Sequence, residues 1–524
     1  MIRLRDIALP PEHSVSQLSF EAARMLKIQN SKVRDIKLVR RSVDARRKDD
    51  IKIIYTIDVK IDGNEQKILR QSGCRRAAIA TVSFYKPPKK IEAQCRPVVV
   101  GFGPAGMFAA LLLAMAGLRP LVLERGEDAQ SRHEKVEKFF ATGELDPRSN
   151  VQFGEGGAGT FSDGKLNTGV NNPRIGWILE QMVKAGARED ILFDAKPHVG
   201  TDVLLTVVQN IRGRIISLGG EVRFNSHVTG MEKDGNQITG LILENGEVVP
   251  CTHCVLAIGH SARDTFSMLY GSGISMEPKP FAMGVRIEHP QTLINTAQYG
   301  KNDPVLPPAD YKLVKHLEDE TVYTFCMCPG GFVVAATSEE GSVVTNGMSY
   351  ADRDGENANA ALLVSVNPKD FPGDDVLAGV RWQEEIEKKA FQVGGGNYFA
   401  PAQRVEDFLA KRPSTGPGAV TPTYRPGVTW CDLHDVLPQK LTRALKEALP
   451  QLDGNLKGFC HPDSVLTAPE TRSSSPVRIL RDETKQSVSL KGLYPAGEGA
   501  GYAGGIMSAA IDGMTCAEAI IGSL

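Results

Sequence analysis

The sequence lacks long hydrophobic runs. Its most apolar stretch, Met107 to Ala116, is about ten residues long, whereas a membrane-spanning helix needs about 18 or more. The residues after Met1 enter an alternating pattern without the apolar region or cleavage site of a signal peptide. We therefore expect a cytoplasmic protein with no membrane insertion.

The sequence also lacks a cysteine framework. Its nine cysteines are scattered among 524 residues, with no regular spacing. Small disulfide-stabilised secreted domains space their cysteines more densely and more regularly. The pattern excludes that class and fits reduced thiols.

No sign of charge dominates the whole chain, whose net charge is −1, but the charges are distributed unevenly. Residues 1–96 carry 22 Lys and Arg against 11 Asp and Glu, and the remainder carries 39 against 51. A basic N-terminal module on an acidic body indicates a polyanion or protein partner. The simpler alternative is that the module only docks on the acidic body.

Residues 1–90 are predicted to form a small basic α+β domain. Alternating apolar residues in Ile2–Ala8 and Ile51–Ile61 predict strands with one buried face. The Pro- and Lys-rich segment Lys86–Lys90 is typical of a linker and follows this domain. No cofactor motif precedes Val98, so we expect the domain to contribute binding and not redox chemistry.

The strongest motif is the glycine turn Gly101-Phe-Gly-Pro-Ala-Gly106. A short apolar strand precedes it, a helix follows it, and Glu124 ends the next strand, which is the context of a dinucleotide-binding βαβ unit. The first glycine makes the tight turn, Gly103 lets the backbone approach a pyrophosphate, and the third lets helix and strand pack closely. Glu124 is expected to accept hydrogen bonds from ribose hydroxyls.

Three later segments favour FAD over NAD. Val255–Gly259 is a short strand with a glycine that returns to the dinucleotide, and Gly497–Ile506, containing Glu498, leads into an Ala-rich helix. The glycine-rich loop Gly154–Lys165 can wrap closely around a cofactor, because glycine removes side-chain bulk. FAD is therefore the predicted cofactor. The predicted cofactor-binding residues are Gly101, Gly103, Pro104, Ala105, Gly106, Glu124, Arg125, Gly156, Gly157, Ala158, Gly159, Thr160, Val228, Ala257, Gly259, Gly497, Glu498, Gly504, Gly505 and Ile506.

Nearly the whole chain resembles a bacterial family of FAD-dependent dehydrogenases, often labelled NAD(FAD)-utilising dehydrogenases, within the glutathione-reductase-like FAD superfamily. The segments that carry the resemblance are Arg40–Lys48, Gly156–Gly169, Ala257–Phe266, Gly284–Gln291, Cys326–Gly331, Val344–Ser349 and Pro469–Ile479. The resemblance implies an FAD-binding oxidoreductase and supplies no substrate.

The predicted fold class is α/β, with a discontinuous Rossmann-like FAD-binding domain. Residues 91–275 form its first part and residues 481–524 its C-terminal part. Residues 276–480, rich in Pro, Gly and β-formers, form an inserted, mixed β-rich domain that faces the substrate. Only one glycine motif has the βαβ context, so NAD(P)H, if it is the reductant, would dock transiently at the substrate face. A quinone or a protein electron donor is the open alternative.

Three residues are candidates for catalysis. Arg472 could stabilise negative charge on a reduced flavin or bind a substrate carboxylate, unless it lies in a solvated surface loop. Lys165, with Asp163, could contact the cofactor or form a local ion pair. Cys328, with Cys326, could exchange electrons as a dithiol, although the single intervening residue favours two structural thiols.

The predicted function is an FAD-dependent oxidoreductase that transfers a hydride or electrons to a small-molecule substrate through non-covalent FAD. The alternatives are a flavin-dependent RNA-modifying enzyme and a non-enzymatic flavoprotein that acts as a redox sensor or scaffold. The basic segment Arg40–Lys48 lacks aromatic residues for stacking bases, beyond Tyr55, which weakens the RNA alternative.

Overall fold

The computed structural model describes residues 1–81, 84–92 and 95–524. Its N-terminal part is a β-α-β-β-α-β unit with antiparallel sheet order β2-β3-β1-β4, the ferredoxin-like arrangement. The elements are β1 (Ile2–Leu9), α1 (Ser16–Leu26), η1 (Asn30–Lys32), β2 (Val33–Asp44), β3 (Lys52–Ile61), α2 (Glu65–Ser72) and β4 (Ala77–Ile79).

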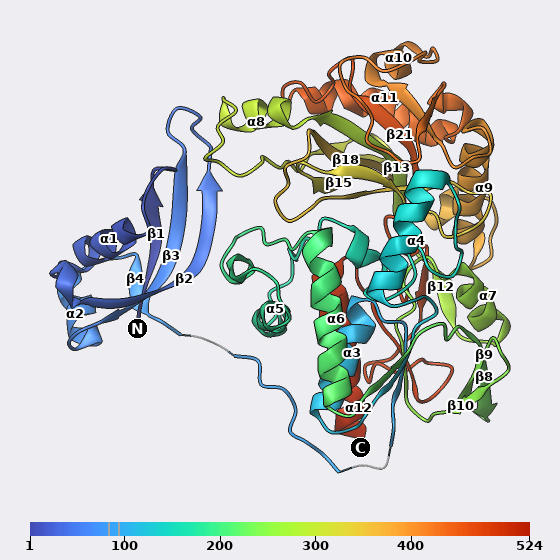
Figure 1. The fold of residues 1–524 in the computed structure, drawn as a ribbon, viewed down its shortest axis with the longest axis horizontal. Helices are drawn as coiled ribbons and strands as arrows, with labels where there is room; N and C mark the ends of the chain where they lie inside the picture. The colour runs from blue at the N-terminus through green and yellow to red at the C-terminus, as the bar shows by residue number, and fades with distance from the viewer. Residues whose placement is uncertain (82–83, 93–94) are drawn as a thin grey trace.

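The alternation predicted for the third strand is present in the sheet. Tyr55, Ile57 and Val59 are buried on the side that α1 and α2 cover. Figure 1 shows this unit in blue beside the rest of the chain, with both helices on the sheet face that points away from the body. The opposite face has no helix and turns toward the body.

A five-stranded parallel sheet, of order β23-β11-β5-β6-β7, forms the centre of the body. Its strands are apolar triplets, as expected when both faces of a parallel sheet are covered. The bounds are β5 (Val98–Val100), β6 (Leu121–Leu123), β7 (Glu221–Arg223), β11 (Cys254–Leu256) and β23 (Leu493–Pro495). The last strand comes from far along the chain, so the sheet is discontinuous in sequence.

Helices cover one face of this sheet, and α3, α6 and α12 lie side by side there (Figure 1). A three-stranded sheet and α7 pack on the other face. The elements are α3 (Pro104–Met115), α4 (Ala129–Thr142), η2 (Gly157–Phe161), α5 (Arg174–Lys184), η3 (Glu189–Leu192), α6 (Thr201–Ser217), β8 (Val228–Asp234), β9 (Gln237–Leu243), β10 (Val248–Pro250), α7 (Arg263–Gly271) and α12 (Ile506–Ser523).

A seven-stranded sheet of order β14-β15-β18-β13-β21-β19-β20 occupies most of the predicted substrate-facing region. Its strands are β13 (Phe281–Pro290), β14 (Val314–His316), β15 (Thr321–Cys328), β18 (Asn357–Val366), β19 (Ala400–Arg404), β20 (Val428–Trp430) and β21 (Val465–Glu470). Around it lie β12 (Met276–Pro278), α8 (Gln291–Tyr299), β16 (Phe332–Ala335), β17 (Thr345–Met348), η4 (Pro368–Asp370), α9 (Ala378–Val393), α10 (Val405–Ala410), η5 (Leu433–Asp435), α11 (Gln439–Asp453) and β22 (Val477–Ile479).

Some predicted bounds were wrong. The first helix of the body starts at Pro104, inside the glycine motif, because proline suits the first helical position. Residues 276–480 were predicted to form a mixed, β-rich domain, but α8 to α11 within them were not predicted. The domain boundaries at residues 90, 275 and 480 stay predictions. No helix within the described ranges has both the length and the hydropathy needed to cross a membrane.

Candidate functional site

A cavity of about 720 Å³ lies between the parallel sheet and the seven-stranded sheet. One wall comes from the loops that follow β5, β6, β11 and β23, and the other from the ends of β15, β17 and β21. The cavity therefore opens at the carboxyl ends of the parallel strands, which is where open α/β sheets place their ligands.

The glycine turn forms one edge of this cavity. Gly101 has φ +92°, and a Cβ there would collide with the carbonyl oxygen of Ala257. A Cβ on Gly106 would overlap the carbonyl oxygen of Gly101, so the helix packs directly on the turn. At Gly103, in contrast, the nearest atom to such a Cβ is the Cα of Gly157, at 3.7 Å. Of these three glycines, only Gly103 leaves room where a Cβ would be, and this room belongs to the cavity.

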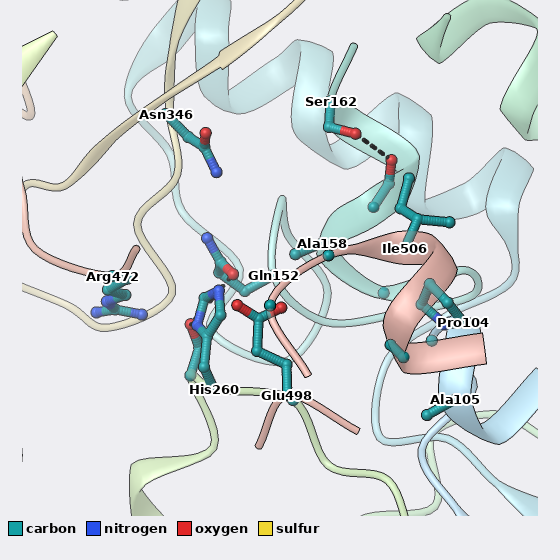
Figure 2. A pocket seen from close by; sticks show the side chains of 18 of the residues that line it. Pro104, Ala105, Gln152, Ala158, Ser162, His260, Asn346, Arg472, Glu498 and Ile506 are labelled. Carbon is teal, nitrogen blue, oxygen red and sulfur yellow. Dashed lines mark hydrogen bonds between the residues drawn. The ribbon is translucent and has the colours of Figure 1, made fainter. Parts of the chain in front are cut away.

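Two helices present their N-termini to the cavity. The residue that caps α3 is Gly103 and the residue that caps α12 is Gly505, and neither can supply a side-chain acceptor. Figure 2 shows Pro104 and Ile506, the first residues of these helices, on the same side of the cavity. The first backbone N–H groups of a helix are unpaired and carry partial positive charge. The arrangement suits the pyrophosphate of a dinucleotide.

The Glu124 end of the cavity has its polar groups paired. The Glu124 carboxylate, 5% exposed, accepts hydrogen bonds from the backbone N–H groups of Phe102, at 2.8 Å, and of Gly126 and Gly154, both at 3.0 Å. The neighbouring Arg125 donates to Asp264 and lies over the Phe153 ring. Glu124 thus fixes three loops around the turn, a structural role that the sequence analysis did not assign to it.

The Glu498 end differs. No residue in the described part of the chain donates a hydrogen bond to the Glu498 carboxylate. Burial raises the pKa of this carboxyl to about 7, and Lys279 opposes that shift. In Figure 2, the side chains of Glu498, Gln152 and His260 converge at the centre of the cavity. Burial, together with the charges of Arg472 and Arg263, lowers the pKa of His260 to about 3, so its imidazole is neutral.

Arg472 lies in the cavity wall and is 6% exposed, so the surface-loop alternative is wrong. Its guanidinium donates to the Glu387 carboxylate at 2.6 Å and to the Ser338 hydroxyl at 2.6 Å. Arg263 donates to the same carboxylate, at 2.7 Å. Burial alone would raise the pKa of Glu387, but the two arginines hold it at about 2. The positive charge predicted for the cavity is therefore paired with a carboxylate.

A second carboxyl in the wall, Glu470, lies 3.1 Å from the fully buried guanidinium of Arg286. Burial raises the pKa of Glu470 to about 7 despite this arginine. The same guanidinium approaches Cys328, whose thiol pKa is raised by burial. Cys328 is buried, whereas Cys326 is exposed. A buried Cys328 thiol with a raised pKa fits a structural role better than a dithiol relay.

Lys165 and Asp163 form the local ion pair that was one of two alternatives, with 3.3 Å between charged atoms. Asp163 also accepts from Arg353 at 2.6 Å, and Lys165 donates to the backbone carbonyl of Met327. Both residues line the cavity as well. Lys165 thus connects the glycine-rich loop to the end of β15.

Most of the predicted cofactor-binding residues line the cavity. They are Gly101, Gly103, Pro104, Ala105, Glu124, Arg125, Gly157, Ala158, Gly159, Val228, Ala257, Gly259, Glu498, Gly504, Gly505 and Ile506. Gly106, Gly156, Thr160 and Gly497 are not among its lining residues. At Gly497, for example, a Cβ would meet the Cβ of Ala105 at 2.8 Å, so this glycine packs behind the wall.

The sequence analysis missed several lining residues, among them Gln152, Ser226, His260 and Asn346. Ser226 and His260 follow strands of the parallel sheet, Gln152 lies in the loop between α4 and η2, and Asn346 lies within β17. For Ser226 and His260 position was a signal, because residues just after strands of a parallel sheet collect at one edge. His260 and Asn346 also belong to segments that carry the family resemblance, which assigns them no role.

Comparisons with known proteins support the flavin assignment. Residues 280–473 match the family described as FAD-dependent protein, C-terminal domain-like, and residues 1–60 match a domain family of unknown function. The chain is 47% identical to a protein of Clostridium beijerinckii, over 99% of this chain and 98% of that protein.

Solved structures show only distant likeness. L-proline dehydrogenase from P. horikoshii is 11% identical, with TM-score 0.37 over 83% of this chain and 94% of that one. Glycine oxidase from Bacillus cereus is 12% identical, with TM-score 0.33 over 82% and 96%. Similarity at this level does not establish a shared fold or function. The placement of the chain in the glutathione-reductase-like superfamily stays a prediction.

Proposed function

We propose, from the premise that this chain belongs to one family with the Clostridium beijerinckii protein and carries an FAD-dependent protein C-terminal domain, that it is an FAD-dependent oxidoreductase acting on a small molecule. The observation that carries the proposal is the single cavity into which the glycine turn and two uncapped helix N-termini open. An oxidoreductase needs such a site to hold a dinucleotide in one fixed orientation.

The residues present fit FAD as an extended ligand. Gly103 and the N-terminus of α3 would hold the pyrophosphate, and Glu124, Arg125 and Val228 surround the space for the adenosine. Glu498 and the N-terminus of α12 would hold the flavin end. FMN has no adenosine and would leave the Glu124 end empty, so FAD is the better fit.

Bound FAD would supply a two-electron acceptor and donor, and the chain's own groups would handle protons and orientation. Glu470, with a pKa of about 7, is placed to take or give a proton at the substrate-facing wall. Lys165 and Cys328 line the same wall. The Arg472–Glu387 pair would orient a polar substrate group more than it would stabilise new negative charge.

RNA modification is the weaker alternative. Tyr55, the one aromatic residue that the basic segment offered for stacking, is 6% exposed and hydrogen-bonded to His13. It lies on the sheet side covered by α1 and α2. A base cannot stack on it without unfolding that core.

The test is the flavin content and redox behaviour of the purified full chain. We expect a yellow protein that releases about one FAD per chain on denaturation and becomes colourless with dithionite under anaerobic conditions. NADH and NADPH, added in parallel, would identify a nicotinamide reductant if either bleaches the flavin. Release of FMN, or a colourless protein that does not take up added FAD, would overturn the proposal.

A further inference from the structure

A second cavity, of about 410 Å³, lies between the N-terminal sheet and the body. From the N-terminal side it is lined by Arg3, Arg5, Val39, Arg40 and Thr56, which are residues of β1, β2 and β3. These side chains belong to the sheet face that no helix covers. In Figure 1 this face is turned toward the body, near α5.

The charges in this cavity do not balance. Arg3 is paired with Asp58 through two hydrogen bonds, of 2.7 and 2.8 Å. Asp194, the one acid of the body wall, is taken by Arg41 through bonds of 2.6 and 2.8 Å. Arg5 and Arg40 are exposed, and within residues 1–81, 84–92 and 95–524 neither forms an ion pair with a carboxylate. Two guanidinium groups are therefore uncompensated.

The two uncompensated arginines lie on β1 and β2, the strands on either side of β3. Arg40 is paired in register with Thr56 of β3. On the other side of β3, Leu4 pairs with Ile57 and Ile7 with Tyr55, so the bulge that contains Arg5 lies beside Thr56. Since β3 separates the two arginines, an anion placed over Thr56 can accept hydrogen bonds from both guanidinium groups.

The wall of the second cavity that belongs to the body contains both apolar and polar residues. Leu166, Ile191 and Pro197 contribute apolar surface, and Asn167 and Thr168 contribute hydrogen-bonding groups. Asn167 and Thr168 also line the large cavity. A ligand whose anionic group sits between Arg5 and Arg40 can therefore extend toward the large cavity.

We propose that this second cavity is a binding site for the phosphate group of a small phosphorylated ligand, held by Arg5, Arg40 and the hydroxyl of Thr56. Two guanidinium forks match the several oxygens of a phosphate or pyrophosphate better than a single carboxylate. The site is built from the protein alone and does not depend on whether FAD occupies the large cavity. A strand of RNA is a poor occupant, because the sheet face has no exposed aromatic residue among its lining side chains.

The first arm of the test titrates the full-length protein with inorganic pyrophosphate in a calorimeter at low ionic strength. We expect one site whose affinity falls with added salt. The double variant Arg5→Gln/Arg40→Gln should bind roughly 100-fold more weakly, about tenfold for each charge-assisted hydrogen bond removed. A control, Arg24→Gln/Arg34→Gln, removes the same charge from exposed arginines paired with Glu21 and Asp62 and should bind as the unchanged protein does.

The second arm distinguishes the sources of the phosphate. NADPH or NADH binding that depends on Arg5 and Arg40 would identify a nicotinamide reductant, whereas pyrophosphate binding without either would point to a phosphorylated substrate. Both results support the site. Flavin content is measured in every variant and should not change, which separates this proposal from the proposed function. Equal pyrophosphate affinity in the double variant, no binding to the unchanged protein, or binding of tRNA but not of pyrophosphate would overturn it.

Discussion

The two ends of the large cavity contrast in how their carboxylates are satisfied. Glu124 accepts three backbone hydrogen bonds and ties the glycine turn to two other loops. The Glu498 carboxylate accepts none in the described structure, and burial raises its pKa to about 7. One end is complete before any ligand binds, whereas the other carries a carboxylate whose charge is costly until a partner arrives. The contrast indicates that Glu124 stabilises the loops that form the cavity, whereas the charge of Glu498 depends on which ligand occupies the cavity.

The largest effect on folding free energy is expected from adding a side chain in the glycine turn, at the Glu124 end of the cavity. Gly106→Val would drive a side chain into the carbonyl oxygen of Gly101 and should cost at least about 4 kcal/mol of folding free energy. Gly103→Val meets open space instead, so it should fold normally and lose the flavin. Thermal unfolding and flavin content separate the two outcomes. Gly213→Val, at an exposed glycine of α6, is the control; a Gly103→Val protein with full FAD content would refute the cofactor assignment.

The next largest effect on stability is expected from removing the Glu124 carboxylate, whose hydrogen bonds are all to the backbone. Glu124→Ala leaves three backbone N–H groups without their acceptor and should cost about 3 kcal/mol, measured by urea unfolding of the flavin-free protein. Glu498→Ala removes no hydrogen bond seen in the structure and should cost much less. If the two variants are equally destabilised, the contrast between the two ends is wrong.

A smaller effect on stability is expected from a change in pH. The pKa of Glu498 and of Glu470 is about 7 in the folded protein, against an ordinary value of 4.5. The folded state therefore holds protons that the unfolded state has released. Between pH 4.5 and pH 7 these groups lower the stability of the flavin-free protein as pH rises, by up to about 3 kcal/mol each.

The variant Glu498→Gln isolates this pH effect from that of the other titrating groups. Its melting temperature should exceed that of the unchanged protein at pH 8 and differ little from it at pH 5. Melting curves across this range check the sign. A gap between the two proteins that narrows toward pH 8 would contradict the assignment of an unpartnered carboxyl.

The smallest effect is expected at Arg472. Because Glu387 neutralises its charge, Arg472→Ala should shift the flavin reduction potential by no more than about 30 mV, which is about 1.4 kcal/mol for two electrons. Redox titration against a reference dye measures this shift. Arg472→Lys, which keeps the charge, is the control. A much larger shift in the alanine variant alone would mean that the guanidinium acts directly on the flavin.

The sequence predicted the local parts of this site well. The glycine turn, the short strand before it and Glu124 belong to one βαβ unit, whose spacing is set by local geometry. The alternation in Ile51–Ile61 likewise predicted its buried face, whereas a bulge between Leu4 and Ile7 shifts the alternation predicted for Ile2–Ala8. In both cases the residues that interact are near in sequence or follow one simple period.

The sequence could not predict the long-range pairs. Glu387 sits on α9 among other charged residues, and nothing in its spacing indicates that it accepts from Arg472, 85 residues later. The same holds for Arg286 and Glu470, which β13 and β21 bring together by antiparallel pairing. The first contact depends on how α9 packs and the second on sheet order, and the periodicity of single elements encodes neither.

The discontinuity of the parallel sheet has a consequence for biosynthesis. The ribosome makes β23, the Glu498 loop and α12 after all the other walls of the cavity. The N-terminal unit can fold early, since its four strands pair with one another, and β2 adds a bridge from Arg41 to Asp194 of the body. Until α12 emerges, the apolar surface of α3 that it covers in the finished fold stays exposed. We expect nascent chains to need chaperone protection at this surface, and flavin to be loaded only after synthesis has passed α12.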